Sequence, residues 1–238
     1  MPRPLSDQTR LGTDRPPGVV DGAGGAGDVG GAGGGQSAAT GRRARERIER
    51  RRRQILQAAA RLMQETGYHA MSMQTLAERA DVSVGLIYQY FTGKEDVLHA
   101  VIVDILEDFH HEVPPRVAAA GDDPVARLAA AVRGFCEIVD GKRAATTLTY
   151  RESKSLSPQV LRHIKDLEVQ TTEPIRRAVE DGIERGLFRE VVPELVVHNV
   201  LMTAHGWALK HWNLAPRMTL EEYVAQETDL VLASIRVT

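Results

Sequence analysis

The sequence contains very little cysteine: Cys136 is the only one in its 238 residues. A lone cysteine cannot form an intramolecular disulfide, and it excludes zinc or iron–sulfur sites built from several cysteines. No stretch approaches the ~18 consecutive apolar residues of a transmembrane helix. The N-terminus lacks the apolar core of a secretory signal, so we expect a cytoplasmic protein. Aromatic residues are only 5 % of the chain, which disfavours an all-β sandwich or barrel.

Charge is unevenly distributed along the chain, although the formal net charge is only −2. Residues 1–41 hold 12 of the 21 glycines and are expected to form a disordered tail, because they cannot bury enough apolar surface to offset chain entropy. Residues 42–98 carry a net charge of +4, whereas residues 99–238 carry −5. This asymmetry predicts a basic module with an anionic partner, followed by a larger second module. Helical spacing of apolar residues from residue 42 onward predicts an all-α fold.

The basic module begins with a predicted helix from about Arg43 to Glu65, and Gly67 is expected to stop it as a C′ glycine. Its apolar residues recur at helical spacing and form one face, comprising Ile48, Ile55, Ala59 and Leu62. Arginines crowd the first turns: Arg42, Arg43, Arg45, Arg47 and Arg50 to Arg53. Cations oppose the macrodipole at a helix N-terminus, so contact with phosphates is one interpretation. A solvated charged face, interleaved with Glu46 and Glu49, is the other.

Two short helices are expected next, between residues 72 and 91. Ser72 and Ser83 are favourable N-cap residues, and Asp81-Val82 forms a tight turn between the helices. Two short helices joined by such a turn, after a longer supporting helix, make a helix-turn-helix. The second helix of this motif enters the major groove of DNA.

The second short helix has an inner and an outer face. Ile87 and Phe91 lie four residues apart and are expected to face inward. The outer face would present Val84, Gly85, Tyr88 and Gln89. Among these, Gln89 can make a bidentate contact to adenine. Tyr88 and Tyr90 can donate hydroxyls to phosphates, although Tyr90 has packing against the first helix as an alternative, and Lys94 could hold another phosphate.

Four stretches of this module carry a specific pattern: Ile55-Leu-Gln-Ala-Ala-Ala-Arg-Leu62, Glu65-Thr-Gly-Tyr68, Leu76-Ala-Glu-Arg-Ala-Asp-Val-Ser83 and Ile87-Tyr-Gln-Tyr-Phe-Thr-Gly-Lys-Glu-Asp-Val-Leu98. On these stretches, residues 48–98 resemble the DNA-binding domain of the TetR family of bacterial transcriptional regulators. The resemblance implies an all-helical homodimer that binds a near-palindromic operator in double-stranded DNA and usually represses. Carried over by position, the implied DNA contacts beyond the arginines are Ser72, Gln74, Ser83, Val84, Gly85, Tyr88, Gln89, Tyr90 and Lys94. The family often has Thr or Ser where Met73 stands, and the arginine run is longer than usual.

Residues 99–238 are expected to form further helices. The first continues from about Lys94 to His111 and is ended by Pro114-Pro115. Asp123-Pro124 and Ser157-Pro158 are N-terminal signals for two more, and Pro174 is expected to kink or break the second of these. The last two helices run from Pro193 to Trp212 and onward from a capping box at Thr219 and Glu222. The resemblance implies that these two pair with their copies in a four-helix bundle.

The second module is expected to bind a small-molecule effector. Tyr150-Arg-Glu-Ser and His205-Gly-Trp-Ala-Leu-Lys-His-Trp212 are similar to stretches in family members that sense acyl-CoA thioesters. The candidate ligand-binding residues are Phe135, Tyr150, Arg151, Lys154, Met202, Trp207 and Lys210. An acyl chain needs an apolar tunnel, and the phosphates of CoA need Arg or Lys. Cys136 and Trp207 each have an alternative as buried core residues.

Other classes of function fit the sequence less well. His198 and His205 share a helix face but are seven residues apart, about 10.5 Å, which is too far to ligate one metal ion. No Gly-x-Ser-x-Gly occurs, and a hydrolase would need a nucleophile with a paired base, so we expect no catalysis, cofactor or membrane partner. An architectural, weakly sequence-specific DNA-binding protein that uses the arginines alone remains the alternative. The favoured hypothesis is a repressor whose effector tilts the helix at residues 94–111 and weakens operator binding.

Overall fold

A computed structural model describes the backbone of residues 33–237 and the side chains of residues 41–43 and 46–237. The chain divides into two units, Met1–Ala44 and Arg45–Thr238, and the architecture below is that of the second unit. In chain order the helices are α1 (Gly33–Thr66), α2 (Met73–Ala80), α3 (Val84–Tyr90), α4 (Lys94–Ala119), α5 (Pro124–Gly141), α6 (Arg143–Glu152), the 3-10 turn η1 (Ser153–Ser155), α7 (Pro158–Glu184), α8 (Pro193–Leu209), α9 (His211–Leu214) and α10 (Leu220–Ile235). The described residues contain one isolated β-bridge, Phe188 to Arg236, and otherwise helices and loops. The predicted all-α fold is therefore confirmed.

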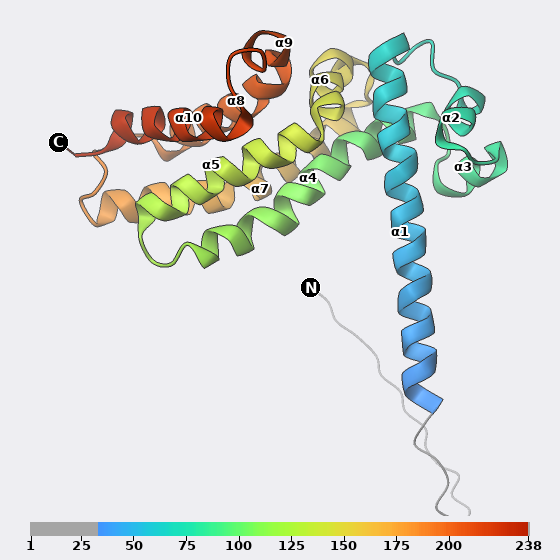
Figure 1. Ribbon diagram of the computed structural model, residues 1–238, viewed down its shortest axis with the longest axis horizontal. Helices are drawn as coiled ribbons and strands as arrows, with labels where there is room; N and C mark the ends of the chain where they lie inside the picture. The colour runs from blue at the N-terminus through green and yellow to red at the C-terminus, as the bar shows by residue number, and fades with distance from the viewer. Residues whose placement is uncertain (1–32, 238) are drawn as a thin grey trace, which may run out of the picture. The chain divides into compact units, whose positions relative to one another are not determined.

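The helix-turn-helix module (residues 45–98) forms around a core to which α4 and α6 also contribute. Figure 1 shows α2 and α3 beside the C-terminal part of α1. Ile55 from α1, Leu76 from α2 and Ile87 from α3 are each fully buried between these helices. Phe91 joins them at 2 % exposure, so the predicted inward face of the second short helix is confirmed.

The predicted local signals of this module have the expected geometry. The Ser72 hydroxyl accepts from the Thr75 amide and forms a capping box with that residue, and the Ser83 hydroxyl accepts from the Leu86 amide. Asp81 adopts φ +54°, which makes the turn between α2 and α3 tight. Gly67 ends α1 with φ +86°, a left-handed conformation that favours glycine.

The start of α1 differs from the prediction. The helix begins at Gly33 rather than near Arg43, so it includes residues 33–41 of the stretch that was expected to be a disordered tail. The remainder of that stretch, residues 1–32, lies outside the described residues. Of the predicted apolar face, Ile55, Ala59 and Leu62 are buried, whereas Ile48 is 48 % exposed because it precedes the part of α1 that packs on α2 and α3.

The prolines of α4 do not end it, which corrects the prediction. The helix passes through Pro114 and Pro115 to Ala119. Each proline lacks the amide hydrogen of one helical bond, but Val113 and Val117 are buried on either side of the pair. Arg116 also bridges Glu112 of the same helix and Glu137 of α5, at 2.8 and 2.6 Å. These contacts outweigh the local preference to stop.

Pro174 does not break α7, although the prediction allowed a kink or a break there. The helix runs unbroken from Pro158 to Glu184 through Pro174. Ile175 is fully buried next to the proline. Arg176 forms ion pairs with Glu173, three residues before Arg176, and with Glu180, four residues after it. The predicted N-caps of α5 and α7, Asp123 and Ser157, are confirmed.

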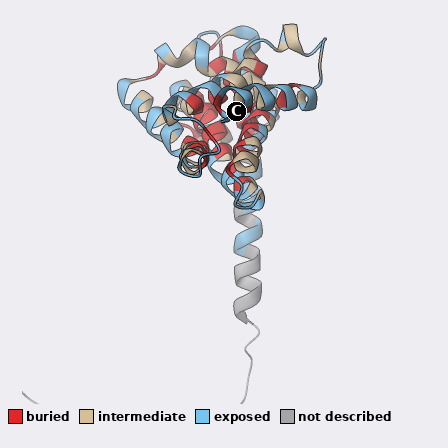
Figure 2. Cartoon of the chain, turned by 90° about the vertical axis from the view of Figure 1, so that its left-hand side faces the viewer, coloured by how far each residue is buried: buried red, intermediate tan, exposed pale blue. Residues whose placement is uncertain are grey.

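The C-terminal module (residues 99–235) is a layered helical bundle with its own core. α4 lies along α5 and α7, and α8 and α10 pack on α5 (Figure 1). Buried residues lie on the facing sides of the helices, and the outward sides are exposed (Figure 2). The rings of Phe109 and Phe135 stack with centroids 4.4 Å apart in this core. None of the helices described between residues 33 and 237 is long and apolar enough to cross a membrane.

Candidate nucleic-acid interface and effector pocket

The outer face of α3 is open to an approaching partner. Tyr88 is 56 % exposed and Val84 37 %, while Gly85 and Gln89 are also exposed. A Cβ atom added at Gly85 would meet nothing within 4 Å, so packing inside the chain does not exclude alanine there. Because Ile87 is fixed in the core and Ser83 caps the first turn, this outer face is held in one orientation.

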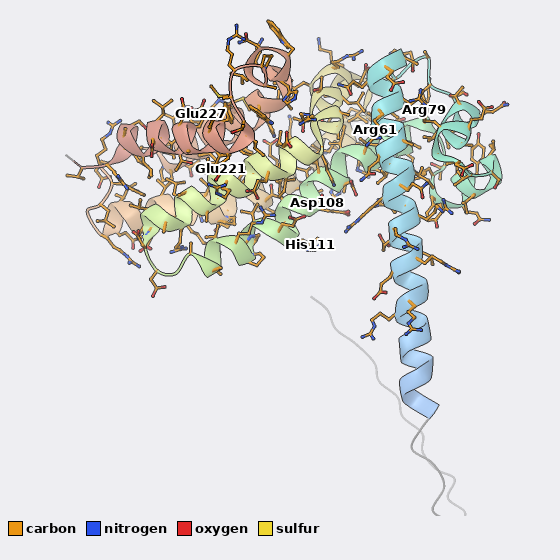
Figure 3. All side chains as sticks on the ribbon, in the orientation of Figure 1. Arg61, Arg79, Asp108, His111, Glu221 and Glu227 are labelled. Atoms are coloured by element: carbon orange, nitrogen blue, oxygen red, sulfur yellow. The ribbon has the colours of Figure 1, made fainter. Side chains whose placement is uncertain are left out.

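Two contacts position α2 against α1. Arg79 of α2 donates two hydrogen bonds to the Glu65 carboxylate of α1, at 3.1 and 2.7 Å, and Figure 3 labels Arg79 beside the C-terminal part of α1. The hydrogen bond from Arg79 lowers the pKa of Glu65. The Gln54 side chain of α1 donates to the Ala80 carbonyl at the end of α2, at 3.3 Å. The supporting helix thus meets the residue that precedes the turn into α3.

The other predicted DNA-contact residues have varied surroundings. Ser72, Gln74 and Ser83 are exposed. Tyr90 is half-buried and packs against the helix-turn-helix core. Lys94 donates to the His69 carbonyl at 3.3 Å and lies 5.0 Å from the Tyr68 ring centroid.

The arginines at the start of α1 are described only in part. Arg42 and Arg43 are exposed, and the side chain of Arg45 lies outside the described residues. Among the described residues of α1 ahead of Ile55, none is buried.

The C-terminal module contains a small pocket of about 40 Å³ between α4, α6, α7 and α8. Its lining is mostly apolar, and consists of Ile102, Ile105, Leu106, Phe109, Thr146, Thr149, Tyr150, Ile164, Glu168 and His205. The Tyr150 hydroxyl lies 2.9 Å from Nδ1 of His205. Burial lowers the pKa of His205 to about 4, so its ring is neutral at pH 7 and can accept this hydrogen bond.

The seven predicted ligand-binding residues are not all brought together. Tyr150 lines the pocket, and its hydroxyl is 3.9 Å from the sulfur of Met202. Phe135 is fully buried behind Phe109. Trp207 is buried and donates to Asp140 at 2.7 Å. It is therefore a buried core residue, which was the alternative to a ligand-binding role.

The predicted cationic residues lie away from the pocket lining. Arg151 donates to the Gln64 carbonyl of α1 at 3.5 Å, while Lys154 and Lys210 are exposed. Glu168, Thr146 and Thr149 line the pocket but were not among the predicted residues. The spacing of Thr146, Thr149 and Tyr150 would have placed the three on one helix face, had α6 been recognised.

Neither metal nor nucleophile chemistry is favoured by the arrangement. In the part of the chain that the structure describes, no three His, Cys, Asp or Glu side chains gather as metal ligands would. Cys136 is fully buried, and burial raises the pKa of its thiol to about 12. A thiol in this state is protonated and unreactive at pH 7, and it packs as the small core residue that its alternative predicts.

Comparison with known proteins identifies the family. Residues 55–101 match the model described as "Bacterial regulatory proteins, tetR family", and residues 121–235 match "Tetracyclin repressor-like, C-terminal domain". The chain is 38 % identical over 179 residues to the HTH-type transcriptional regulator HbdR of Aromatoleum sp. (strain CIB), covering 75 % of this chain and 78 % of that protein. This chain belongs to the TetR family. It is a DNA-binding transcriptional regulator, as predicted, and the regulators of this family are not enzymes.

Two further relatives are an activator and a protein whose structure contains a coenzyme A thioester and operator DNA. The HTH-type transcriptional activator FasR of Mycolicibacterium smegmatis is 31 % identical, covering 64 % of this chain and 70 % of that protein. The crystal structure of AibR in complex with isovaleryl coenzyme A and operator DNA aligns with a TM-score of 0.64 at 25 % identity, covering 76 % of this chain and 97 % of that one.

Proposed function

We propose that this chain is a homodimeric repressor that binds a near-palindromic operator through α3 and releases it when a short acyl-CoA thioester fills the pocket. The observation that carries this proposal is the position of α4 in both cores. Val97 and Leu98 lie in the helix-turn-helix core, whereas Ile105 and Phe109 lie in the C-terminal core and line the pocket. A shift of α4 caused by an occupant of the pocket would therefore reach the recognition helix.

The exposed face of α3 supplies the contacts to bases. Gln89 makes a bidentate contact to adenine, and Val84 and Gly85 allow the helix to approach the floor of the major groove. The remaining predicted residues bind phosphates of the DNA backbone: Arg42, Arg43, Arg45, Ser72, Gln74, Ser83, Tyr88, Tyr90 and Lys94. Phosphate contacts fix the position of the protein, and base contacts provide specificity.

The dimer forms through α8 and α10. Leu195 and Met202 on α8 are 58 % and 40 % exposed, and Leu230 on α10 is 65 % exposed. Exposed apolar residues gathered on two neighbouring helices favour burial against a second copy. A two-fold interface would place the two α3 helices about 34 Å apart, one turn of DNA.

The pocket is small and would have to widen around a short acyl group. Its volume of about 40 Å³ is well below the ~300–1,000 Å³ typical of ligand sites. Its lining is mostly apolar, and Tyr150 and His205 can bond a thioester carbonyl or a polar substituent. The relative whose structure holds isovaleryl coenzyme A supports this ligand class. Arg151, Lys154 and Lys210 are the proposed partners of the CoA phosphates.

A charge cluster links the start of α6 to α4. Lys142, between α5 and α6, donates to the Asp104 carbonyl at 2.7 Å and lies 2.5 Å from a carboxylate oxygen of both Asp104 and Asp108. Both aspartates belong to α4, where Figure 3 labels Asp108. When an effector displaces α6, Lys142 pulls on α4. Coupling between two such sites is typically 1–3 kcal/mol.

Fluorescence anisotropy with labelled DNA tests this function. An operator is first selected from a random duplex library with the wild-type protein. We expect isovaleryl-CoA to release the protein, while free CoA does not and a long-chain acyl-CoA does so less effectively. Specific binding that no thioester weakens would contradict the effector class, and failure of any sequence to be enriched would contradict operator binding.

A further inference from the structure

The basic segment of α1 that precedes the helix-turn-helix core carries a stripe of arginines along one side of the helix. Residues 42–53 contain eight arginines and two glutamates. The family match to the DNA-binding domain begins only at residue 55, so this segment lies ahead of the matched domain. The arginines described below belong to the same unit as α2 and α3.

The contacts of Gln54 show which side of α1 faces the helix-turn-helix. Gln54 donates to the Ala80 carbonyl, directly before the turn into α3. Residues three, four and seven positions apart share a helix face. Arg51, Arg50 and Arg47 precede Gln54 by these intervals, and Arg51 also donates to the Gln54 side chain at 3.0 Å. Arg47, Arg50 and Arg51 form the stripe. It continues the face of α1 that meets α2 and the turn.

The stripe is exposed beyond the end of α2. Arg50 and Arg47 lie about 6 and 10.5 Å before Gln54 along the helix axis, and both are exposed. Among the residues that the structure describes, neither has an ion-pair partner. Arg52 differs, because it points toward α4 and lies 3.9 Å from Glu107.

We propose that Arg47 and Arg50, with Arg51 beside them, bind the phosphates of duplex DNA that flanks the operator. This inference rests on operator binding by α3. Once α3 occupies the major groove, the stripe extends from the same side of the module by more than one helical turn, toward phosphates that α3 does not reach. An arginine guanidinium matches a phosphate in charge and in hydrogen-bonding geometry. The contact adds affinity for flanking DNA of any sequence and no base preference.

The test compares duplexes of two lengths and three proteins. One duplex contains the selected operator alone, and the other adds ten base pairs of unrelated sequence at each end. The proteins are the wild type, Arg47→Gln/Arg50→Gln and the matched control Arg162→Gln/Lys165→Gln, which changes two exposed cations three residues apart on α7. The control removes the same charge from the C-terminal module and leaves α1 unchanged.

The wild type and the control should bind the longer duplex about tenfold more tightly at low salt, whereas Arg47→Gln/Arg50→Gln should bind both lengths alike. The slope of log affinity against log salt on the longer duplex should fall by about 1.8 per protomer for two lost phosphate contacts. Preference among operator sequences should not change.

Two results would overturn the proposal: a length-dependent gain retained by Arg47→Gln/Arg50→Gln, or an equal loss in the control. If selection enriched no operator, the proposed function would fail. Binding by the stripe would then be measured on an unrelated 40-base-pair duplex. A slope of log affinity against log salt that is unchanged in Arg47→Gln/Arg50→Gln would overturn the proposal.

Discussion

The helix-turn-helix module and the C-terminal module are stabilised over different distances along the chain. In the first, a capping box, a second N-cap and a left-handed turn residue lie within residues 72–83. In the second, polar contacts join distant residues, such as Arg127 to Asp181 and Trp207 to Asp140, which are 54 and 67 positions apart. The caps and the turn of the module that presents a fixed surface to DNA are therefore specified locally, although Arg79 to Glu65 and Gln54 to Ala80 hold α2 against α1 over 14 and 26 positions. The module that contains a pocket depends on packing between helices.

The largest expected effect tests the core of the C-terminal module. Phe135→Ala removes a fully buried ring that stacks on Phe109, and should lower the free energy of unfolding by about 3–5 kcal/mol. Urea unfolding followed by circular dichroism measures the loss. The exposed control Val84→Ala should change it by less than about 0.5 kcal/mol. A loss below 1 kcal/mol for Phe135→Ala would contradict the packing described for this core.

The next effect concerns pH and the pocket. The pKa of His205 is about 4 in the folded chain, against ~6.5 when unfolded. The unfolded chain thus binds one more proton between these values, so stability falls as pH drops from about 6.5 to 4, by at most about 3 kcal/mol.

His205→Gln should remove this part of the pH dependence in urea unfolding series. His69→Gln, which changes an exposed histidine, should retain it. Identical pH profiles for the wild type and His205→Gln would contradict a neutral, buried His205.

The smallest effect compares one helix cap from each module. Ser83→Ala and Thr219→Ala each remove a hydroxyl that accepts from a backbone amide of the first turn, and each should cost about 1 kcal/mol of stability. Only Ser83→Ala should also weaken operator binding, because Ser83 begins the recognition helix. Calorimetry and anisotropy measure the two quantities. Equal operator affinities for the two variants would remove the distinction between the modules.

The same contrast explains what the sequence predicts. Ser72, Ser83 and Gly67 act on their immediate neighbours, so their roles as caps and helix terminator could be predicted, as could the outward face of α3. By the same local rules, Pro114 was predicted to end α4 and Pro174 to kink or break α7, and neither proline ends its helix. Buried neighbours and ion pairs such as Arg116 to Glu137 keep those helices continuous, and such contacts are visible only once the helices are packed.

The pocket was predictable only in part for the same reason. Tyr150 and His205 were candidates by resemblance, but their contact at 2.9 Å joins residues from α6 and α8. Glu168 comes from α7, and no local spacing relates it to the other two. The predicted cationic residues Lys154 and Lys210 are exposed and do not line the pocket.

Selection of operators by Gln89→Ala tests most directly the claim that α3 reads DNA. The wild type and the variant are each used to enrich duplexes from a random library, and the enriched sequences are compared position by position. The account predicts that the variant loses its preference for adenine at one position in each half-site, a discrimination of about 1–3 kcal/mol, while the other positions keep theirs. Identical sequence preferences for the two proteins would contradict it.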